Sequence, residues 1–385
     1  MKPKEQSAAQ QPAYRVALLG TKFMGKAHSQ AYRNVNMYFP DAPRVECVVI
    51  CGRNPAETEQ ARGAFGWQEA STDWRAVVAR GDIDIVDVST PGNLHCEMAV
   101  AAARAGKHIV CEKPLANTLP EAERMVAAVE EAGVGHLLMH NYRRVPAVAL
   151  AKRMVDDGRL GRIYHFRARY LQDWAMSPDL HLVWRFDAKL AGSGALGDLG
   201  AHVIDLGRYL CGEISSLAAT SETFIKRRSL APGSDETAAV TVDDAAALCV
   251  RFDNGAIGTI EASRFAPGRK NHNTFEINGS KGSLTFDLEN LNVLRFYSVD
   301  DQPDAQGFHE IIACSLGKHP YADNWWFDGH LLGYEHSFTH TVYDWLQALA
   351  AGKSTHPDFH DGLRNQRVLD AAERATESRR WETVG

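Results

Sequence analysis

The sequence predicts a two-domain α/β protein, in which a doubly wound parallel sheet precedes an α+β domain with a large, mainly antiparallel open sheet. Three observations lead to this prediction. The chain has 385 residues, which is more than a single hydrophobic core usually serves. Up to residue 140, short apolar runs alternate with amphipathic helical segments, as in parallel βαβ units. From residue 216 onward, strand-like runs follow one another across short turns, as in antiparallel sheets.

The first domain is expected at residues 15–140. Its five predicted strands are RVALLG at 15–20, VECVVI at 45–50, IDIVDVST at 83–90, KHIVC at 107–111 and GHLLMH at 135–140. Amphipathic helical segments separate these strands, so the sheet should be parallel and covered on both faces. The polar start of the chain, residues 1–14, is predicted to be a disordered tail.

The second domain is expected at residues 141–385. It should begin with a helix at 145–157, a strand at 162–174 and a helix near 198–210. Strands then dominate from 216 to 300, joined by turn sequences such as DNG, NGS and KGS. Residues 334–378 are predicted to be helical and are candidates to pack back on the first domain.

Composition excludes several classes of protein. The net charge of -6 gives no electrostatic reason to hold nucleic acid or an anionic membrane. No apolar run approaches the roughly 20 residues of a membrane span, and the polar start lacks the core of a signal peptide. Seven scattered cysteines without a Cys-x-x-Cys pair indicate a reducing compartment, so we expect a cytoplasmic protein. No His or Cys cluster has zinc spacing, and no metal site is expected.

A glycine-rich turn, GTKFMGKAH, follows the first predicted strand. Gly20 and Gly25 occupy the first and third glycine positions of G-x-G-x-x-G, and Lys22 takes the second. Such a turn aims a helix N-terminus at a pyrophosphate, so Gly20, Lys22, Phe23, Met24 and Gly25 are predicted to bind a dinucleotide. The alternative is a turn that serves only helix packing.

The end of the second predicted strand bears on cofactor choice. The acid that bonds the adenosine ribose in NAD enzymes is missing, and the chain reads Gly52-Arg53 instead. A small residue followed by Arg leaves room and positive charge for a 2′-phosphate. This favours NADP over NAD; the alternative is a solvated Arg in a loop.

Lys113 stands in the sequence CEKP, directly after the fourth predicted strand. Ligands of open α/β sheets bind at the carboxyl ends of the strands. Lys113 is therefore a candidate to hydrogen-bond a substrate hydroxyl and stabilise charge on its oxygen. The alternative is a surface Lys in a turn.

Asp198 and His202 are four residues apart in GDLGAHVID, which places them on one face of a helix. An Asp one turn before a His can orient the imidazole and raise its basicity. The pair would then remove a hydroxyl proton while hydride leaves the same carbon. The alternative is a helix-capping Asp and a structural His.

Polar and aromatic residues cluster at three further places in the second domain. Aromatic faces with amide and carboxylate neighbours suit sugar binding, although packing at a sheet edge is the alternative. The set comprises Asn141, Tyr142, Arg143, Gln172, Asp173, Trp174, Trp184 and Arg185.

These motifs occur in the order of the glucose–fructose oxidoreductase/inositol dehydrogenase (Gfo/Idh/MocA) family, and the chain resembles that family from residue 15 to about 380. The motifs that carry the resemblance are GTKFMGKAH, STPGNLH at 89–95, CEKP and GDLGAHVID. The resemblance implies an N-terminal Rossmann domain and a second domain whose large sheet builds homodimers or homotetramers. Segments such as YLQDW and AGSGALGD are especially similar to members that oxidise C3 of an anhydro-sugar.

The resemblance also implies roles for individual residues. Lys113 would position the hydroxyl, with Asp198 and His202 as the catalytic pair. Gln172, Asp173 and Trp174 would touch the sugar, as would Asn141 and Tyr142. The nicotinamide end would be lined by Ser89, Thr90, Pro91, Asn93, His95 and Glu112, with Trp184 and Arg185 facing cofactor and substrate.

The leading hypothesis is an NAD(P)-dependent oxidoreductase that moves a hydride between nicotinamide and a CH–OH carbon of a sugar, anhydro-sugar or polyol. Two alternatives stay open, since fold does not fix function: a nucleotide-sensing regulator without catalysis, and a glycosidase that oxidises C3 transiently. The segment HPYADNWWFDGH at 319–330 either closes the pocket or meets a neighbouring subunit.

Overall fold

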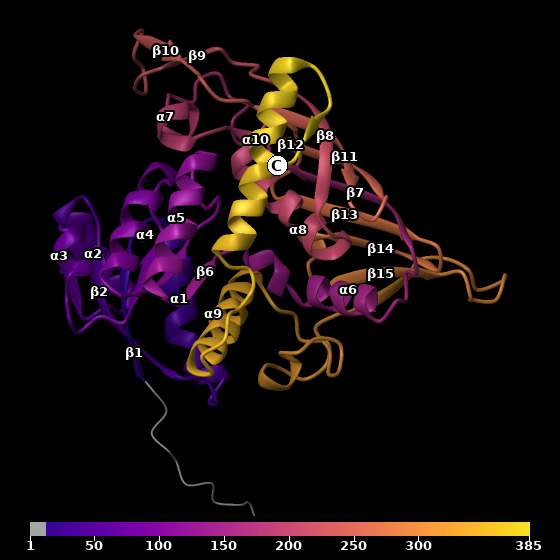
Figure 1. Ribbon diagram of the computed structural model, residues 1–385, viewed down its shortest axis with the longest axis horizontal. Coiled ribbons are helices and arrows are strands. Elements are labelled where there is room, and N and C mark those ends of the chain that lie inside the picture. Colours follow the sequence, from indigo (N-terminus) through magenta and orange to yellow (C-terminus); the bar gives the residue numbers. More distant parts are fainter. Residues whose placement is uncertain (1–12) are drawn as a thin grey trace, which may run out of the picture.

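The computed structural model describes residues 13–385, with one large sheet in each half of the chain (Figure 1). The predicted tail, as far as residue 12, lies outside the described residues. Ala13 and Tyr14 already belong to the first strand, so the folded part begins slightly earlier than predicted. None of the helices within residues 13–385 is long and apolar enough to cross a bilayer.

The first sheet is parallel throughout and has six strands in the order β3-β2-β1-β4-β5-β6. The predicted doubly wound sheet is thereby confirmed. The chain order reverses between β1 and β4, which makes the carboxyl ends of these two strands the crevice where such sheets bind ligands. The strands are β1 Ala13–Leu19, β2 Arg44–Cys51, β3 Glu69–Ser71, β4 Ile85–Val88, β5 His108–Cys111 and β6 His136–Leu138.

One strand of this sheet, β3, was not predicted. It has three residues, Glu69–Ser71, and none of them is buried. A short polar edge strand leaves no apolar run in the sequence, and it is therefore invisible to pattern analysis.

Five helices cover the first sheet: α1 Phe23–Tyr38, α2 Pro55–Phe65, α3 Trp74–Val78, α4 His95–Arg104 and α5 Leu119–Ala132. Side chains cap most of the N-termini. Asn54 accepts hydrogen bonds from the first turn of α2, and Thr118 does the same for α5. In contrast, α1 starts without a side-chain cap and without an acid in its first turn. Its first backbone N–H groups are thus left for another acceptor.

The second sheet has nine strands in the order β16-β15-β14-β13-β7-β12-β11-β8-β17. All neighbouring strands are antiparallel except β7 and β12, so the prediction of a large, mainly antiparallel sheet is correct. The strands are β7 Ile163–Leu171, β8 Ile214–Glu222, β11 Ala245–Phe252, β12 Ile257–Ser263, β13 His272–Gly279, β14 Gly282–Asp287, β15 Val293–Ser298, β16 His309–Ile312 and β17 Glu382–Thr383. A separate ribbon joins β9 Arg227–Ser229 to β10 Thr237–Ala239.

One face of this sheet is buried under helices. Phe166, Ile260 and Phe275 share a core with the apolar residues of α8, Ala201–Cys211, and almost every residue of this helix is buried. The chain enters α8 through a π-helical turn, Leu196–Gly200, which is wider than an α-helical turn. Helix α6, Pro146–Asp156, covers part of the same face, and the short α7 spans Ala188–Ala191. The opposite face forms an open groove of about 840 Å³ over β7, β8 and β11–β14.

The predicted helical stretch at the C-terminus consists of two helices that lie between the halves of the molecule (Figure 1). Helix α9, Tyr334–Ala350, packs on α1, and the rings of Phe39 and Tyr343 stack at 4.2 Å. Helix α10, Phe359–Ser378, contacts both α5 and β8. Together they tie the nucleotide-type sheet to the second sheet.

The segment 319–330 lies against the C-terminal end of α1. Trp325 packs on Tyr38 with ring centroids 4.1 Å apart, and its indole N–H donates to His340. Because the glycine-rich turn is at the opposite end of α1, the segment does not cover that turn. Trp326 and Phe327 remain exposed.

We predict that Trp345→Ala strongly destabilises the protein, since Trp345 on α9 is only 2% exposed within the core of the first sheet. Truncating a buried aromatic side chain costs about 3–5 kcal/mol. Trp326→Ala is the matched control and should cost about 1 kcal/mol or less, because this side chain is 46% exposed. Urea unfolding followed by circular dichroism measures both; equal losses would contradict the described packing of α9.

Candidate functional site

The turn after β1 is shaped by close backbone packing. Gly20 has φ +139°, and a Cβ there would lie 2.5 Å from the carbonyl oxygen of Ser89. A Cβ on Gly25 would lie 2.2 Å from the carbonyl oxygen of Gly20. Only glycine fits at either position, and the turn brings the uncapped N-terminus of α1 beside the end of β4. Phe23 is exposed there and stacks on Tyr334, while Met24 lies behind it, partly buried.

The two departures from the usual nucleotide motif have local explanations. Lys22 is the N-cap residue of α1, and its Nζ forms an exposed ion pair with Glu57 at 2.6 Å. A Cβ on Gly52 would approach Thr58 Oγ1 to 2.5 Å and Thr21 Cγ2 to 2.6 Å. The missing side chain at Gly52 therefore makes room for these threonines, and the expected space for a 2′-phosphate beside it stays a prediction. Arg53 is exposed beside this point.

Residues after β4 and β5 lie at the same edge of the sheet. Ser89, Thr90, Pro91 and Asn93 are all partly buried there. His95 differs from the expectation that it lines the nicotinamide end, because it is 1% exposed and both ring nitrogens contact backbone carbonyls, those of Thr90 and Pro114. His95 thus joins the two loops. Glu112 is also buried, at 4% exposure.

Lys113 meets Asp198 across the two halves of the chain. The ammonium donates to the backbone carbonyl of Asp198 at 2.9 Å and contacts its carboxylate at 3.3 Å. Arg264, just after β12, holds the other carboxylate oxygen at 3.0 Å. Burial raises the pKa of Asp198, but Lys113, Arg264 and Arg185 outweigh burial and keep the carboxyl ionised with a lowered pKa.

His202 lies next to this ion pair in an aromatic setting. Its ring is 4.6 Å from Tyr142 and 5.7 Å from Tyr170 between centroids, and His140 meets it edge-on at 5.9 Å. Burial, reinforced by Lys113, lowers the pKa of His202 well below its usual value. The imidazole is therefore neutral at pH 7 and can accept a proton.

The expected hydrogen bond between Asp198 and His202 is not among the bonds of the described residues. The π-helical turn at 196–200 changes the rotation between the two positions, so the α-helical i, i+4 argument does not apply. The Asp198 carboxylate is taken by Lys113 and Arg264 instead. Asp205, seven residues after Asp198, forms a buried ion pair with Arg143 at 2.5 Å.

Aromatic and guanidinium groups stack beside Asp198. Arg185 lies over the ring of Trp184 at 4.4 Å, and Arg264 lies over Trp174 at 5.2 Å. Trp184 is 37% exposed, which leaves part of its face open. Burial lowers the pKa of Arg185, while Asp198 opposes that shift. This wall offers flat surfaces and cationic donors on one side of the Lys113 ammonium.

The predicted substrate residues divide into two groups. Tyr142 and Gln172 reach the same polar chain: the Tyr142 and Tyr170 hydroxyls are 2.9 Å apart, and Asn271 Oδ1 accepts from both Tyr170 and Gln172. Asn141 and Asp173 point elsewhere. Asn141 is 2% exposed and donates to Ser337 on α9, while Asp173 pairs with Lys270 at 2.7 Å.

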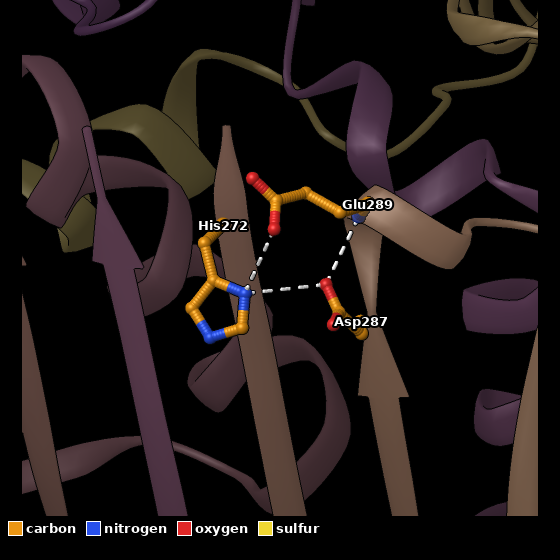
Figure 2. Close-up of side chains that lie close together, drawn as sticks. All are labelled: His272, Asp287 and Glu289. Carbon is orange, nitrogen blue, oxygen red and sulfur yellow. Dashed lines mark hydrogen bonds and ion pairs between the residues drawn. The ribbon is translucent and has the colours of Figure 1, made fainter. Parts of the chain in front are cut away.

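A charged cluster anchors the loop that carries Asn271 (Figure 2). His272 Nδ1 lies 3.4 Å from both Asp287 and Glu289. Glu289 also accepts the backbone N–H groups of residues 270 and 271 and pairs with Arg269 at 3.6 Å. These side chains are of the kinds that bind metal ions. Arg269 and two backbone N–H groups already bind Glu289, however, so we interpret the cluster as an anchor of the loop.

Sequence reasoning missed three residues that shape this site: Tyr170, Arg264 and Asn271. Tyr170 lies within a predicted strand, but the sheet face on which its side chain lies depends on the strand register. Arg264 and Asn271 lie in the loop that joins β12 to β13, and no sequence motif marks them. The signal that could have found them is their position at strand ends beside the predicted strand 162–174.

Comparison with known proteins now identifies the family. Residues 14–140 match the model described as oxidoreductase family, NAD-binding Rossmann fold, and residues 148–285 match the GFO/IDH/MocA C-terminal domain. Levoglucosan dehydrogenase of Pseudarthrobacter phenanthrenivorans is 42% identical over 382 residues, which cover 96% of this chain and 97% of the relative.

Solved structures agree with this assignment. Levoglucosan dehydrogenase in complex with NADH superposes with a TM-score of 0.94 at 42% identity, covering 97% of this chain and 99% of the other. An oxidoreductase domain protein from Kribbella flavida has a TM-score of 0.93 at 48% identity, covering 97% and 100%. With both halves matched and a relative this similar along nearly its whole length, the chain belongs to the Gfo/Idh/MocA family of NAD-binding oxidoreductases.

Proposed function

We propose that this oxidoreductase moves a hydride between nicotinamide and a CH–OH carbon of a sugar, anhydro-sugar or polyol. The observation that carries the proposal is the meeting of Lys113, Asp198 and His202, contributed by both halves of the chain, at the edge where the glycine-rich turn lies. The similarity to levoglucosan dehydrogenase favours an anhydro-sugar, and we propose C3 as the oxidised carbon.

The residues after β1 fit a dinucleotide. The close approach of Gly20 and Gly25 leaves no side chain between the turn and the N-terminus of α1, and no side chain caps the first N–H groups of that helix. A helix N-terminus of this kind binds pyrophosphate. When bound, the nicotinamide ring supplies the carbon that accepts or returns the hydride.

The proposed proton chemistry uses Lys113 and His202. An ammonium has three donors, and Asp198 engages Lys113 through its carbonyl and its carboxylate. A remaining N–H of Lys113 is then free to bond the substrate hydroxyl and to stabilise negative charge on its oxygen. Neutral His202 accepts the hydroxyl proton. Asp198 fixes the position of the lysine instead of orienting the histidine.

The proposed sugar contacts flank this point on two sides. Trp184 and Arg185 provide a stacked face and cationic donors, while Tyr142 and Gln172 present polar groups held by Asn271. Trp174, whose ring packs against the Arg264 guanidinium, extends this wall. Flat apolar faces edged by hydrogen-bonding groups suit a sugar ring.

For self-association, we propose contact through the open face of the nine-stranded sheet. Small residues such as Ala218 and Ala247 lie there beside charged Arg167, Arg169 and Glu261. An exposed sheet face that mixes apolar and charged positions suits contact with another protein surface.

The decisive experiment incubates the purified protein with NAD⁺ or NADP⁺ and a panel that includes levoglucosan, glucose and myo-inositol, and follows absorbance of the reduced cofactor. We expect reduction with at least one anhydro-sugar. Cofactor binding without reduction by any sugar would identify the regulator. Release of aglycone from a nitrophenyl glycoside, without net cofactor reduction, would identify the transient-oxidation glycosidase.

We predict that His202→Ala lowers kcat by about 10²–10⁴, the usual size of general acid–base catalysis. NADH affinity should stay within about twofold, because the altered side chain handles the substrate proton and not the nucleotide. Steady-state kinetics and fluorescence titration with NADH measure the two quantities. A variant that turns over like the unmodified protein would refute the assigned role.

We predict that the protein accepts NADP⁺ as well as NAD⁺, because Arg53 is exposed beside Gly52 and no acid stands at the end of β2. Arg53→Ala should raise KM for NADP⁺ about tenfold, the equivalent of one charge-assisted hydrogen bond, and leave KM for NAD⁺ within about twofold. Arg75→Ala, an exposed arginine on α3 paired with Glu97, is the control. An unchanged KM for NADP⁺ in Arg53→Ala would exclude this role of Arg53.

A further inference from the structure

A buried ion cluster lies beneath the strand ends that form the site. His28, on α1, is 0% exposed. Its Nδ1 contacts the Asp87 carboxylate on β4 at 2.8 Å, and its Nε2 contacts Glu112 after β5 at 2.8 Å. One imidazole therefore bridges two carboxylates from neighbouring strands. The function derived above assigns no role to this residue, although it ends the motif GTKFMGKAH.

The bridge requires a charged imidazole. Both ring nitrogens face carboxylate oxygens, so both must donate. Burial alone lowers the pKa of His28, but Asp87 and Glu112 outweigh burial and raise this pKa to about 10. The imidazolium thus stays protonated at neutral pH, and it balances one of the two buried negative charges.

Two hydroxyl groups and one phenyl ring also contact the cluster. The Tyr32 hydroxyl donates to Asp87 at 2.8 Å, and the Ser89 hydroxyl donates to the same carboxylate at 2.8 Å while lying 3.1 Å from His28 Nδ1. Phe338 of α9 packs on the imidazole with ring centroids 5.6 Å apart. The direct contacts with Asp87 and Glu112 therefore fix the orientation of His28, and Tyr32 acts only on the far side of Asp87.

Glu112 connects this cluster to the catalytic lysine. One of its carboxylate oxygens accepts from His28 Nε2, and the other accepts the backbone N–H of Lys113 at 3.1 Å. Glu112 is only 4% exposed, so bulk water has little access to replace the imidazolium. If the bridge is removed, Glu112 loses its orientation and the Lys113 backbone loses a hydrogen-bond partner.

We infer that His28 is a positioning residue, which acts through Glu112 to hold the backbone of Lys113 where its ammonium meets both Asp198 and the substrate hydroxyl. The inference rests on the proposed function, because it assigns a role in that reaction. If the cluster only joined α1, β4 and β5, disrupting it would lower stability. Any accompanying loss of rate would then be the same with and without the Lys113 side chain.

The test is a double-mutant cycle with His28→Gln and Lys113→Met, read out as the single-turnover rate of cofactor reduction. Glutamine cannot donate to carboxylates on opposite sides. We expect His28→Gln to lower the rate about tenfold or more when Lys113 is present, and less than about twofold in the Lys113→Met background. NADH affinity and the KM for the sugar should change little. Equal losses in both backgrounds would overturn the inference.

Tyr32→Phe is the matched control. It removes a buried hydrogen bond from the same Asp87 carboxylate but leaves the link from His28 to Glu112 intact, so its rate should stay within about twofold of the unmodified protein. A loss as large as that of His28→Gln would assign the effect to general loosening of the cluster and overturn the inference.

If His28→Gln does not fold, as judged by its thermal unfolding curve, Glu112→Gln takes its place in the cycle. The amide oxygen can still accept the Lys113 N–H, but the ionic contact with His28 is lost, and the same dependence on Lys113 is expected. An unmodified protein without activity on any sugar would instead contradict the proposed function. If the unmodified protein is active but the rate losses of the two substitutions are additive, only the role of His28 is contradicted.

Discussion

The contact between Lys113 and Asp198 is the constraint around which the site is organised. Lys113 comes from the end of β5 in the parallel sheet, and Asp198 comes from the π-helical turn that leads into α8. The contact forms only when the two halves of the chain are held in a fixed relation. Helices α9 and α10, which pack against both halves, provide that relation. The C-terminal helices are thus needed to form the site, although none of the proposed reacting groups lies on them.

Motifs that act within one strand–turn–helix unit could be predicted from sequence, whereas contacts between distant strands could not. The glycine-rich turn and Lys113 follow apolar strands of a parallel sheet, and the positions of such strand ends are fixed by topology. Tyr170 and Asn271 meet because β7 pairs with β13 in one particular register. A shift of one residue would turn Tyr170 to the opposite face, and the pairing of two strands about 100 residues apart cannot be read from the local pattern of either one.

Local rules also missed how packing shapes particular positions. At Gly52 the pattern did not reveal that Thr21 and Thr58 occupy the space where a side chain would begin. The spacing of Asp198 and His202 suggested a hydrogen bond on an α-helix, but the intervening turn is π-helical and Lys113 takes the carboxylate. This expectation assumed ideal geometry at a point where the chain is unusual, and functional sites are where such deviations concentrate.

The charges around Asp198 explain how these parts work together in the proposed reaction. Lys113, Arg185 and Arg264 surround a single carboxylate, so the site has more positive than negative charge where an oxygen of the substrate would lose its proton. The excess favours the alkoxide. Burial, reinforced by Lys113, lowers the pKa of His202, so the imidazole is unprotonated and free to accept that proton, although the same positive charge makes it a weaker base. The proposed proton transfer is therefore driven by stabilisation of the alkoxide, and that stabilisation depends on the ammonium of Lys113 remaining beside Asp198.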